Sequence, residues 1–238
     1  MKCSYLLWDR QHRRLGQSRD VLLNDCAPAV LALGVRRLSI DVDDEFSTVK
    51  SPAPKCYRGP EITALFSVVV DDLGVCEAIE RSLRHAGFDL AGYLVDESVY
   101  CDYGGNRHSR PRDWPDGQRS PGVVAVTLLT RPRRFSQAEW LRRWHGRMSP
   151  ISEQIQPRQR YVRNVVLRPL TAQAPPFDGI VEEVWPSAEH ISNPYLFFCA
   201  ENPWQLIKHM SLMLYAILQF HNLFKFRTTT MSEYLVKN

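Results

Sequence analysis

A histidine next to a tryptophan on an amphipathic helix is the first candidate for chemistry in this sequence. His145 follows Trp144 within a segment whose apolar residues recur at the period of an α-helix. The apolar stripe consists of Trp140, Leu141, Trp144, Met148, Ile151 and Ile155. At about 100° per residue, His145 lies about 90° from the centre of this stripe. Its position predicts either a half-exposed structural histidine or a pocket acid/base or hydrogen-bond donor, because histidine titrates near neutral pH.

Tyr161 and Asn164 lie on the segment 161–167, which is rich in β-branched residues and predicts a strand. Side chains alternate along a strand, so residues three positions apart point to opposite faces. Asn164 shares its face with Val162 and Val166, which favours Asn164 as the inward residue. A buried amide needs hydrogen-bond partners. We therefore expect Asn164 to belong to a polar network or to contact a ligand.

Two adjacent glutamates lie on another predicted strand, residues 180–185, which ends at Trp185. Glu182 and Glu183 must point to opposite faces. A glutamate that points inward would have its pKa raised by desolvation and would suit a general base, whereas the alternative for each is a surface position. His221 falls near the centre of the apolar stripe of the last predicted helix. A lone histidine there is either a hydrogen-bonded core residue or a ligand.

The sequence lacks the patterns of metal, nucleotide and serine-hydrolase sites. It has no H-x-x-x-H, no paired Cys/His spacing and no two-histidine, one-carboxylate pattern. It also has no glycine-rich phosphate loop and no G-x-S-x-G elbow. The aromatic strand of an RNA-recognition module is missing. We expect no metal, no cofactor and no nucleic-acid partner.

Composition is that of an ordinary folded protein. Of 238 residues, 44% are hydrophobic and 24% charged, and the formal net charge of +4 is too small to indicate a polyanionic partner. The six cysteines are dispersed, and no stretch approaches the roughly 20 apolar residues that span a bilayer. The N-terminus lacks the apolar run of a signal peptide. These features predict a cytoplasmic protein with reduced thiols and no membrane partner.

An aperiodic segment divides the chain into two halves of similar length. Residues 104–121 are rich in Gly, Pro and Arg and have neither helical nor strand periodicity, which indicates a linker. Each half predicts the order strand, helix, strand, strand, helix, strand. In the N-terminal half these elements are 4–8, 21–33, 38–42, 62–71, 75–86 and 92–99, with a loop at 51–60.

In the C-terminal half, the predicted strands are 123–130, 161–167, 180–185 and 224–231. The first helix begins with Ser136 as its N-cap, and Glu139 completes a capping box. Pro150 is expected to kink this helix or to restart it after Ser149, because proline lacks an amide hydrogen. Asn202 and the proline after it predict the start of the second helix.

A βαββαβ unit leaves one sheet face open, and a second copy commonly covers that face. Two copies in one chain can do so within the molecule. The predicted fold is therefore α+β, with two ferredoxin-like βαββαβ repeats, residues 1–103 and 122–238, forming a pseudo-dimeric α+β barrel. Apolar residues are expected between the two sheets.

Two stretches carry a resemblance to a known family. From 121 to 145 an apolar strand leads into an N-capped helix that ends in Trp144-His145, and Tyr161-Val-Arg-Asn164 follows. These motifs resemble the EthD branch of the dimeric α+β barrel proteins, most strongly over residues 121–238. The resemblance implies that His145 faces a pocket whose wall includes the strand carrying Glu182 and Glu183.

The N-terminal half departs from the family pattern. It has no Trp-His pair, so its repeat is expected to be degenerate, with Asp25 in the place of the missing histidine at the rim of the pocket. The predicted catalytic residues are His145, Asn164, Glu182 and Glu183. The predicted substrate-binding residues are Trp144, Met148, Tyr161, Trp185, His221 and Asp25.

The function that we predict is a cofactor-independent enzyme of the lyase, decarboxylase, isomerase or cyclase type. Its substrate would be a small hydrophobic aromatic or carbonyl metabolite, with His145 as the acid/base. One alternative is a non-catalytic accessory protein that binds such a metabolite or assists an oxygenase. A second is haem binding through His145 or His221. Substrate identity and the formation of a homodimer stay open at this stage.

Overall fold

The computed structural model describes residues 1–50, 60–222 and 225–238. Eight antiparallel strands close into one barrel, in the spatial order β1-β3-β2-β8-β5-β7-β6-β4. The strands are β1 (Lys2–Asp9), β2 (Arg37–Val42), β3 (Ala64–Val69), β4 (Phe88–Cys101), β5 (Val123–Leu129), β6 (Arg160–Pro169), β7 (Gly179–Trp185) and β8 (Arg227–Lys237). Each half of the chain supplies four adjacent strands, and the β2–β8 and β4–β6 pairs join the halves. The predicted α+β chain closed into a barrel is confirmed.

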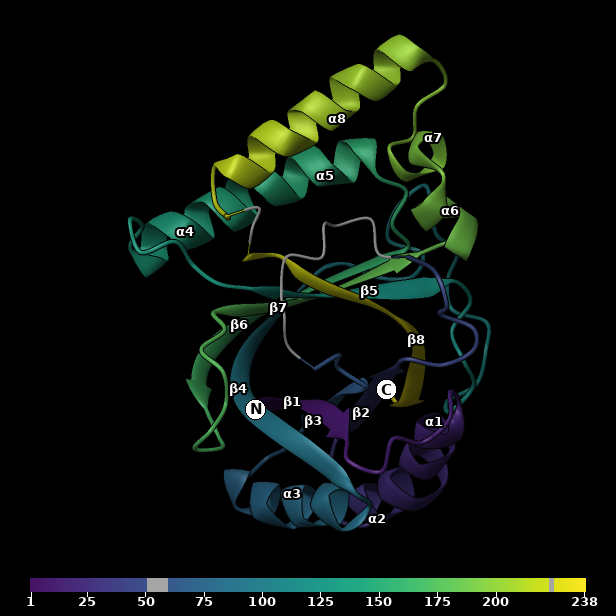
Figure 1. Cartoon of the computed structure of the whole chain (residues 1–238), viewed down its shortest axis with the longest axis vertical. Helices are drawn as coiled ribbons and strands as arrows, with labels where there is room; N and C mark the ends of the chain where they lie inside the picture. The colour runs from purple at the N-terminus through teal and green to yellow at the C-terminus, as the bar shows by residue number, and fades with distance from the viewer. Residues whose placement is uncertain (51–59, 223–224) are drawn as a thin grey trace.

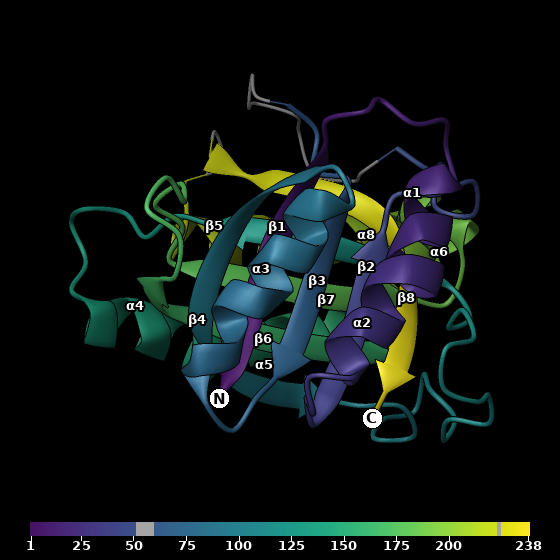
Figure 2. The same cartoon turned by 90° about the horizontal axis from the view of Figure 1, so that it is seen from below.

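Helices cover the outside of the barrel on two opposite sides (Figure 1). One group is α1 (Gln17–Val21), η1 (Leu22–Cys26), α2 (Ala27–Leu31), η2 (Leu73–Val75) and α3 (Cys76–His85). The other is α4 (Gln137–Arg143), η3 (Trp144–Met148), α5 (Ser149–Ile155), α6 (Ala188–Ser192), α7 (Pro194–Phe197) and α8 (Pro203–Leu218). Figure 2 shows α2 and α3 lying across the strands of the N-terminal half. The protein thus has two separate helix–sheet layers around one barrel.

The first long helix of each half is interrupted by a π-helical turn. In the N-terminal half η1 lies between α1 and α2, and in the C-terminal half η3 lies between α4 and α5. Pro28 and Pro150 each occupy the second position after the π turn. Proline cannot donate the next helical hydrogen bond, so the helix restarts there. The interruption predicted at Pro150 is confirmed, although Ser149 does not cap the new helix through its side chain.

Several boundaries differ from the prediction. β8 runs over Arg227–Lys237 instead of 224–231, while Phe224 and residues 51–59 of the predicted loop lie outside the described residues. The short helices α6 and α7 were not predicted. Residues 104–121 contain neither helix nor strand, as expected, but they pack on the barrel: Ser120 is buried, and its Oγ donates to Glu233 Oε2 at 2.7 Å. This segment is therefore part of the packed structure.

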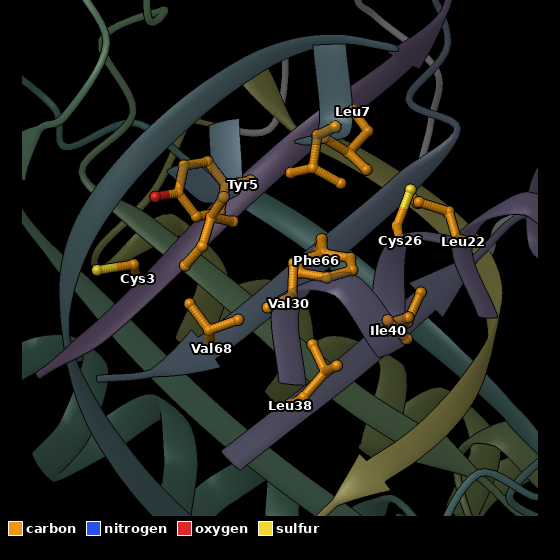
Figure 3. Packing of buried hydrophobic residues seen from close by; sticks show 14 of the residues in the cluster. Cys3, Tyr5, Leu7, Leu22, Cys26, Val30, Leu38, Ile40, Phe66 and Val68 are labelled. Carbon is orange, nitrogen blue, oxygen red and sulfur yellow. The ribbon is translucent and has the colours of Figure 1, made fainter. Parts of the chain in front are cut away.

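Tight apolar packing fills the space between helices and sheet in the N-terminal half (Figure 3). The outward residues of β1, β2 and β3 meet the inward residues of the interrupted helix there. They are Cys3, Tyr5, Leu7, Leu38, Ile40, Val42, Ala64, Phe66 and Val68 from the strands, and Leu22, Cys26 and Val30 from the helix. All of these side chains are nearly or fully buried.

The barrel interior is apolar at one level and charged at another. Leu6, Tyr93, Val126 and Met231 belong to its apolar cluster. Apolar residues lie between the two sheets, as expected, but a network of ionised groups, most of them buried, also crosses the barrel interior. Its cations are Lys2, Arg37 and Arg160, and its carboxylates are Glu97, Glu182 and Glu233.

Asp41 lies fully buried near this network. Burial raises the pKa of Asp41 well above its usual range, and the nearby charges of Glu182 and Glu233 raise it further. The ion pairs of the network join Lys2, Arg37 and Arg160 to Glu97, Glu182 and Glu233, and Arg160 also pairs with the more exposed Asp102. Each of these buried charges therefore faces an opposite charge.

The five described cysteines are free, and Cys56 lies outside the described residues. Among the helices of the described ranges, none is both long and apolar enough to cross a lipid bilayer.

Candidate functional site

A cavity of about 380 Å³ lies between the sheet and the helices of the C-terminal half. The strands β5, β7 and β8 form its floor, and η3, α6, α7 and α8 supply side chains to its walls and roof. Aromatic rings make up much of its surface: Trp144, Tyr161, Trp185, Phe197, Phe220 and Phe226. Its volume is within the range of about 300–1,000 Å³ that is typical of small-molecule sites. The cavity lies outside the barrel interior.

Strand alternation decides which residues of the floor face the cavity. On β7, Val181, Glu183 and Trp185 line it. Their neighbours Ile180 and Val184 pack inside the barrel. The two glutamates therefore point to opposite sides of the sheet, as predicted, and Glu183 is the carboxylate that reaches the cavity.

The π turn η3 brings Trp144 and Met148 to the cavity wall. Trp144 Nε1 donates to the Tyr161 hydroxyl at 3.1 Å, and Ser149 Oγ lies 3.1 Å from the same hydroxyl. Ser149 Oγ also donates to the Trp144 carbonyl at 3.1 Å, which accepts the Ser149 backbone N–H as well. Trp144, Met148, Tyr161 and Trp185 all line the cavity, and their role in substrate binding stays a prediction.

A buried arginine holds the cavity carboxylate in place. Arg158 Nη1 lies 2.5 Å from Glu183 Oε1, and the Arg158 guanidinium stacks 4.1 Å from the centre of the Tyr161 ring. Arg158 Nη2 also donates to Ser152 Oγ at 2.8 Å. Burial lowers the pKa of Arg158, but the charge of Glu183 and the neighbouring Tyr161 raise it on balance. Arg158 therefore stays charged and orients Glu183.

The remaining polar groups of the cavity are few. Trp185 stacks on Phe197 with 4.3 Å between ring centres, and its buried indole N–H has no hydrogen-bond acceptor among the described residues. Thr127 Oγ1 and Thr228 Oγ1 lie 2.9 Å apart on the floor. A buried indole N–H normally finds an acceptor. Gln156 and Ser192 also line the cavity, so a few neutral polar groups accompany its one carboxylate, Glu183.

His145 is not among the described residues that line the cavity. Its ring packs 4.7 Å from the Trp144 ring, and the charges that act on it are those of Arg163 and Asp96, on β6 and β4. Burial and, after it, the charge of Arg163 lower the pKa of His145 to about 4, while Asp96 opposes the shift. The expectation that His145 faces the pocket with a pKa near neutrality is therefore corrected.

Asn164 and Glu182 lie in the barrel interior instead of the cavity. Asn164 Nδ2 donates to Glu182 Oε1 at 2.8 Å and to the Ile180 carbonyl at 3.1 Å. Lys2 Nζ lies 3.1 Å from Glu182 Oε1. Although burial raises the pKa of Glu182, Lys2 and Arg160 lower it on balance. The inward position of Asn164 was predicted correctly, but the raised pKa expected for an inward glutamate was wrong.

The last two predicted binding residues also lie away from the cavity. His221 is buried with its ring 4.3 Å from that of Phe226, and burial lowers its pKa to about 4. It is not among the described lining residues. Asp25 is an exposed residue of η1, on the opposite side of the barrel (Figure 1). In the alignment of the two π turns Leu23, not Asp25, occupies the place of His145.

Sequence reasoning missed two parts of the site. Arg158 lies in an irregular segment between α5 and β6, where no pattern pointed to a partner for Glu183. The α7 helix carries Phe197, and its start at Asn193-Pro194 repeats the Asn-Pro pair that correctly predicted the start of α8. That repeated capping signal could have identified α7.

Within the described ranges, no group of three or more His, Cys, Asp or Glu side chains is arranged to hold a metal ion. The sequence matches no protein-family profile and no curated protein.

The fold is nevertheless similar to those of solved structures. An anthrone oxidase-like protein is 13% identical and aligns over 100% of this chain and 94% of its own, with a TM-score of 0.57. A proposed monooxygenase from Fusobacterium nucleatum is 10% identical, over 99% of this chain and 92% of its own, with a TM-score of 0.44. A haem-binding protein from Thermus thermophilus is 12% identical, over 98% and 90%, with a TM-score of 0.40. At 13% identity the likeness to the first of these structures shows the fold alone.

Proposed function

We propose that the cavity binds a planar aromatic metabolite bearing a hydroxyl or carbonyl group, and that Glu183 acts on it as a general base. The observation that carries this proposal is the placement of a single carboxylate, held by Arg158, among the aromatic lining residues. An apolar pocket with a few convergent polar groups is the usual form of a small-molecule site. We therefore assign the acid/base role to Glu183 instead of His145.

The arrangement suits the removal of a proton from carbon. Glu183 would take a proton from a C–H bond activated by a ring carbonyl, and the electron pair of that bond would move to the carbonyl oxygen. The side-chain amide of Gln156 and the hydroxyl of Ser192, both in the cavity lining, are suited to donate a hydrogen bond to that oxygen. Such an enolate is the common intermediate of isomerases, decarboxylases and cofactor-free oxygenases. The likeness to an anthrone oxidase-like protein agrees with this, because an anthrone is a polycyclic ketone with an acidic CH₂ group.

Hydrogen exchange tests this role directly. Anthrone incubated with the protein in D₂O should exchange its CH₂ protons faster than in buffer, as followed by NMR. Glu183→Gln should lower the catalysed rate by about 10²–10⁴-fold, which is the usual contribution of a general base. His145→Gln is the matched control and should leave the rate within a few-fold of the parent. A large loss of rate in His145→Gln, with little change in Glu183→Gln, would identify His145 as the general base instead.

A second variant guards against loss of folding, since Glu183→Gln leaves Arg158 with only its longer ion pair, 3.4 Å to Glu153. Ala125 lies on β5 in the cavity floor, and Ala125→Leu should block the cavity without changing any charge. Quenching of tryptophan fluorescence by anthrone should disappear in this variant. Quenching that persists with a blocked cavity would place the ligand elsewhere.

A non-catalytic accessory protein is the second candidate. The observation that favours it is the Glu183–Arg158 pair itself, since an ion-paired carboxylate can be purely structural. Ligand binding by the parent protein without any catalysed exchange, over a panel of hydroxylated and keto polycyclic aromatics, would support it. A haem role is not proposed, because neither His145 nor His221 is among the described lining residues.

We also propose that the halves, residues 1–103 and 122–238, are two ferredoxin-like repeats joined by 104–121, and that the second is EthD-like. Support comes from the strand order, which within each half is fourth, first, third, second. The π turns followed by Pro28 and Pro150 add a second correspondence. Separate expression of the two segments and their reassembly into a barrel would test the division.

A further inference from the structure

Helix α8 exposes large apolar side chains on the face that points away from the barrel. They are Trp204, Ile207, Met210, Leu214, Tyr215 and Leu218, with exposed fractions from 46% to 80%. Together they expose on the order of 600 Å², the upper end for the largest apolar patch of a typical monomer. Met213 and Ala216 on the opposite face are buried. Figure 1 shows α8 as the outermost element of its layer.

The exposed residues follow the seven-residue pattern of a helix that packs against another helix. Trp204, Ser211 and Leu218 repeat at intervals of seven, and Ile207 and Leu214 each come three positions later in the same repeat. Ser211, at the centre of the series, is exposed and small, which lets a second helix approach closely. The series is symmetric about it, since Trp204 and Leu218 lie equally far away on either side.

The charges around α8 favour a copy of the same helix in antiparallel orientation. Lys208 is the only charged residue within the helix. At its N-terminal end lies the exposed Glu201, and at its C-terminal end lie the exposed Arg134 and Lys225. A twofold axis through Ser211 brings Glu201 of one copy to the basic end of the other. A lipid surface fits less well, because surface-binding helices carry several basic residues on their second face.

We infer that the outer face of α8 is the contact surface of a homodimer in which two α8 helices pack antiparallel about Ser211. A standard interface buries about 800 Å² per partner, so the α8 face supplies most of one. The inner face of the same helix carries Met213 and Ile217 into the cavity. The dimer would therefore hold the roof of the candidate site in place.

Crosslinking of the full chain tests the geometry. Two packed helices lie 8–10 Å apart and their Cα atoms about 2.3 Å from each axis, so the two 211 Cα atoms would be about 5 Å apart. This separation suits a disulfide, and Ser211→Cys should form a covalent dimer under mild oxidation. Lys208→Cys is the matched control: it is exposed on the same helix, but two copies of residue 208 would be offset by about 9 Å along the axis. It should not crosslink.

Light scattering tests the association itself. The parent should elute with twice its chain mass of 27.5 kDa. Ile207→Glu combined with Leu214→Glu should weaken the dimer by about 100-fold or more, while circular dichroism stays that of the parent. A parent that stays monomeric, or equal crosslinking at positions 208 and 211, would overturn the inference. Binding to anionic vesicles by a chain that stays monomeric would overturn it in favour of a lipid surface.

Discussion

The two helix–sheet layers of this protein are built from the same kinds of element but differ in their packing. In the N-terminal half the layer is solid: Phe66, Leu22 and Val30 are fully buried in continuous packing (Figure 3). In the C-terminal half an interrupted helix of the same α-π-α form covers a cavity of about 380 Å³. The architecture therefore does not determine whether a layer holds a ligand.

The connection to the last helix of each half accounts for the difference. In the N-terminal half, only residues 70–75 separate β3 from α3. In the C-terminal half, residues 186–202 separate β7 from α8 and contain α6 and α7. Figure 1 shows the N-terminal end of α8 held away from the sheet above these short helices. Aromatic residues from the inserted segment, such as Phe197, form part of the wall.

The third strand of each half shows the same divergence in its side chains. The outward residues are Ala64, Phe66 and Val68 on β3, and on β7 they are Val181, Glu183 and Trp185. An apolar ring at the middle position is replaced by a carboxylate. One half thereby packs a continuous apolar layer, and the other lines a cavity.

Removal of packing from the solid layer should have the largest effect. Phe66→Ala is expected to lower the free energy of unfolding by about 3–5 kcal/mol, because it opens a cavity in a fully packed core. Met213→Ala, in the cavity roof, should cost less than about 2 kcal/mol, since one side of Met213 already faces open space. Denaturant unfolding measures both. Equal losses would mean that the two layers do not differ in packing.

Substitutions that enlarge a side chain should destabilise the N-terminal layer more than the C-terminal layer, because only the C-terminal layer has free space. Ala64→Leu overfills the solid layer and should cost about 1–3 kcal/mol. Ala125→Leu faces the cavity and should change stability by less than about 1 kcal/mol while it removes ligand binding. Thermal unfolding and ligand titration of the same two variants check this pair. A stronger destabilisation at 125 than at 64 would contradict the comparison.

The fold could be predicted from the sequence because its signals are local. Runs of β-branched residues indicated strands such as β5 and β6, and alternation correctly separated Tyr161 from Asn164 and Glu182 from Glu183. Ser136 accepts from the Glu139 amide at 3.2 Å, as the capping pattern predicted. These features depend on periods of a few residues, which a sequence displays directly.

The site could be predicted only in part because it depends on contacts between distant segments. Arg158 holds the cavity carboxylate, and nothing local in the sequence marks that pairing. His145 was placed by its family resemblance, but the π turn shifts the helical phase after Arg143, and Arg163 and burial lower the histidine pKa. The cavity itself arises from α6 and α7, which the sequence interpretation had left without structure.

Acidification should affect the cavity half through its histidines. The pKa values of His145 and His221 are about 4 in the folded chain, against about 6.5 in an unfolded one. Between these values the unfolded chain binds more protons, so stability is fully present above about pH 6.5 and declines as the pH falls towards 4. The double variant His145→Gln, His221→Gln should flatten this decline in the melting temperature. His85→Gln, at an exposed position of α3, should not.

Protonation of carboxylates should cause a second decrease in stability at lower pH. Burial raises the pKa of Glu97, but Lys2 and Arg37 outweigh it and hold the pKa at about 2. Its contribution is present above about pH 4.5 and is lost as the pH falls towards 2. A decline between pH 6.5 and 4.5 that survives the double histidine variant would show that other groups control it.

The smallest expected effect concerns the start of the interrupted helix in each half. Ser136 caps α4 through its side chain, whereas α1 begins at Gly16, which has a φ of 88° and makes no side-chain cap bond. Ser136→Ala should cost about 1 kcal/mol, and Ser136→Gly only a few tenths, because glycine leaves the helix end open to water. Gly16→Ala should be more harmful than Ser136→Gly, since alanine is strained at positive φ and its Cβ would lie 2.6 Å from Glu45 Oε2. Melting temperatures of the three variants measure the order of these losses in stability. A decrease for Ser136→Gly as large as that for Gly16→Ala would contradict the expected difference between the two helix starts.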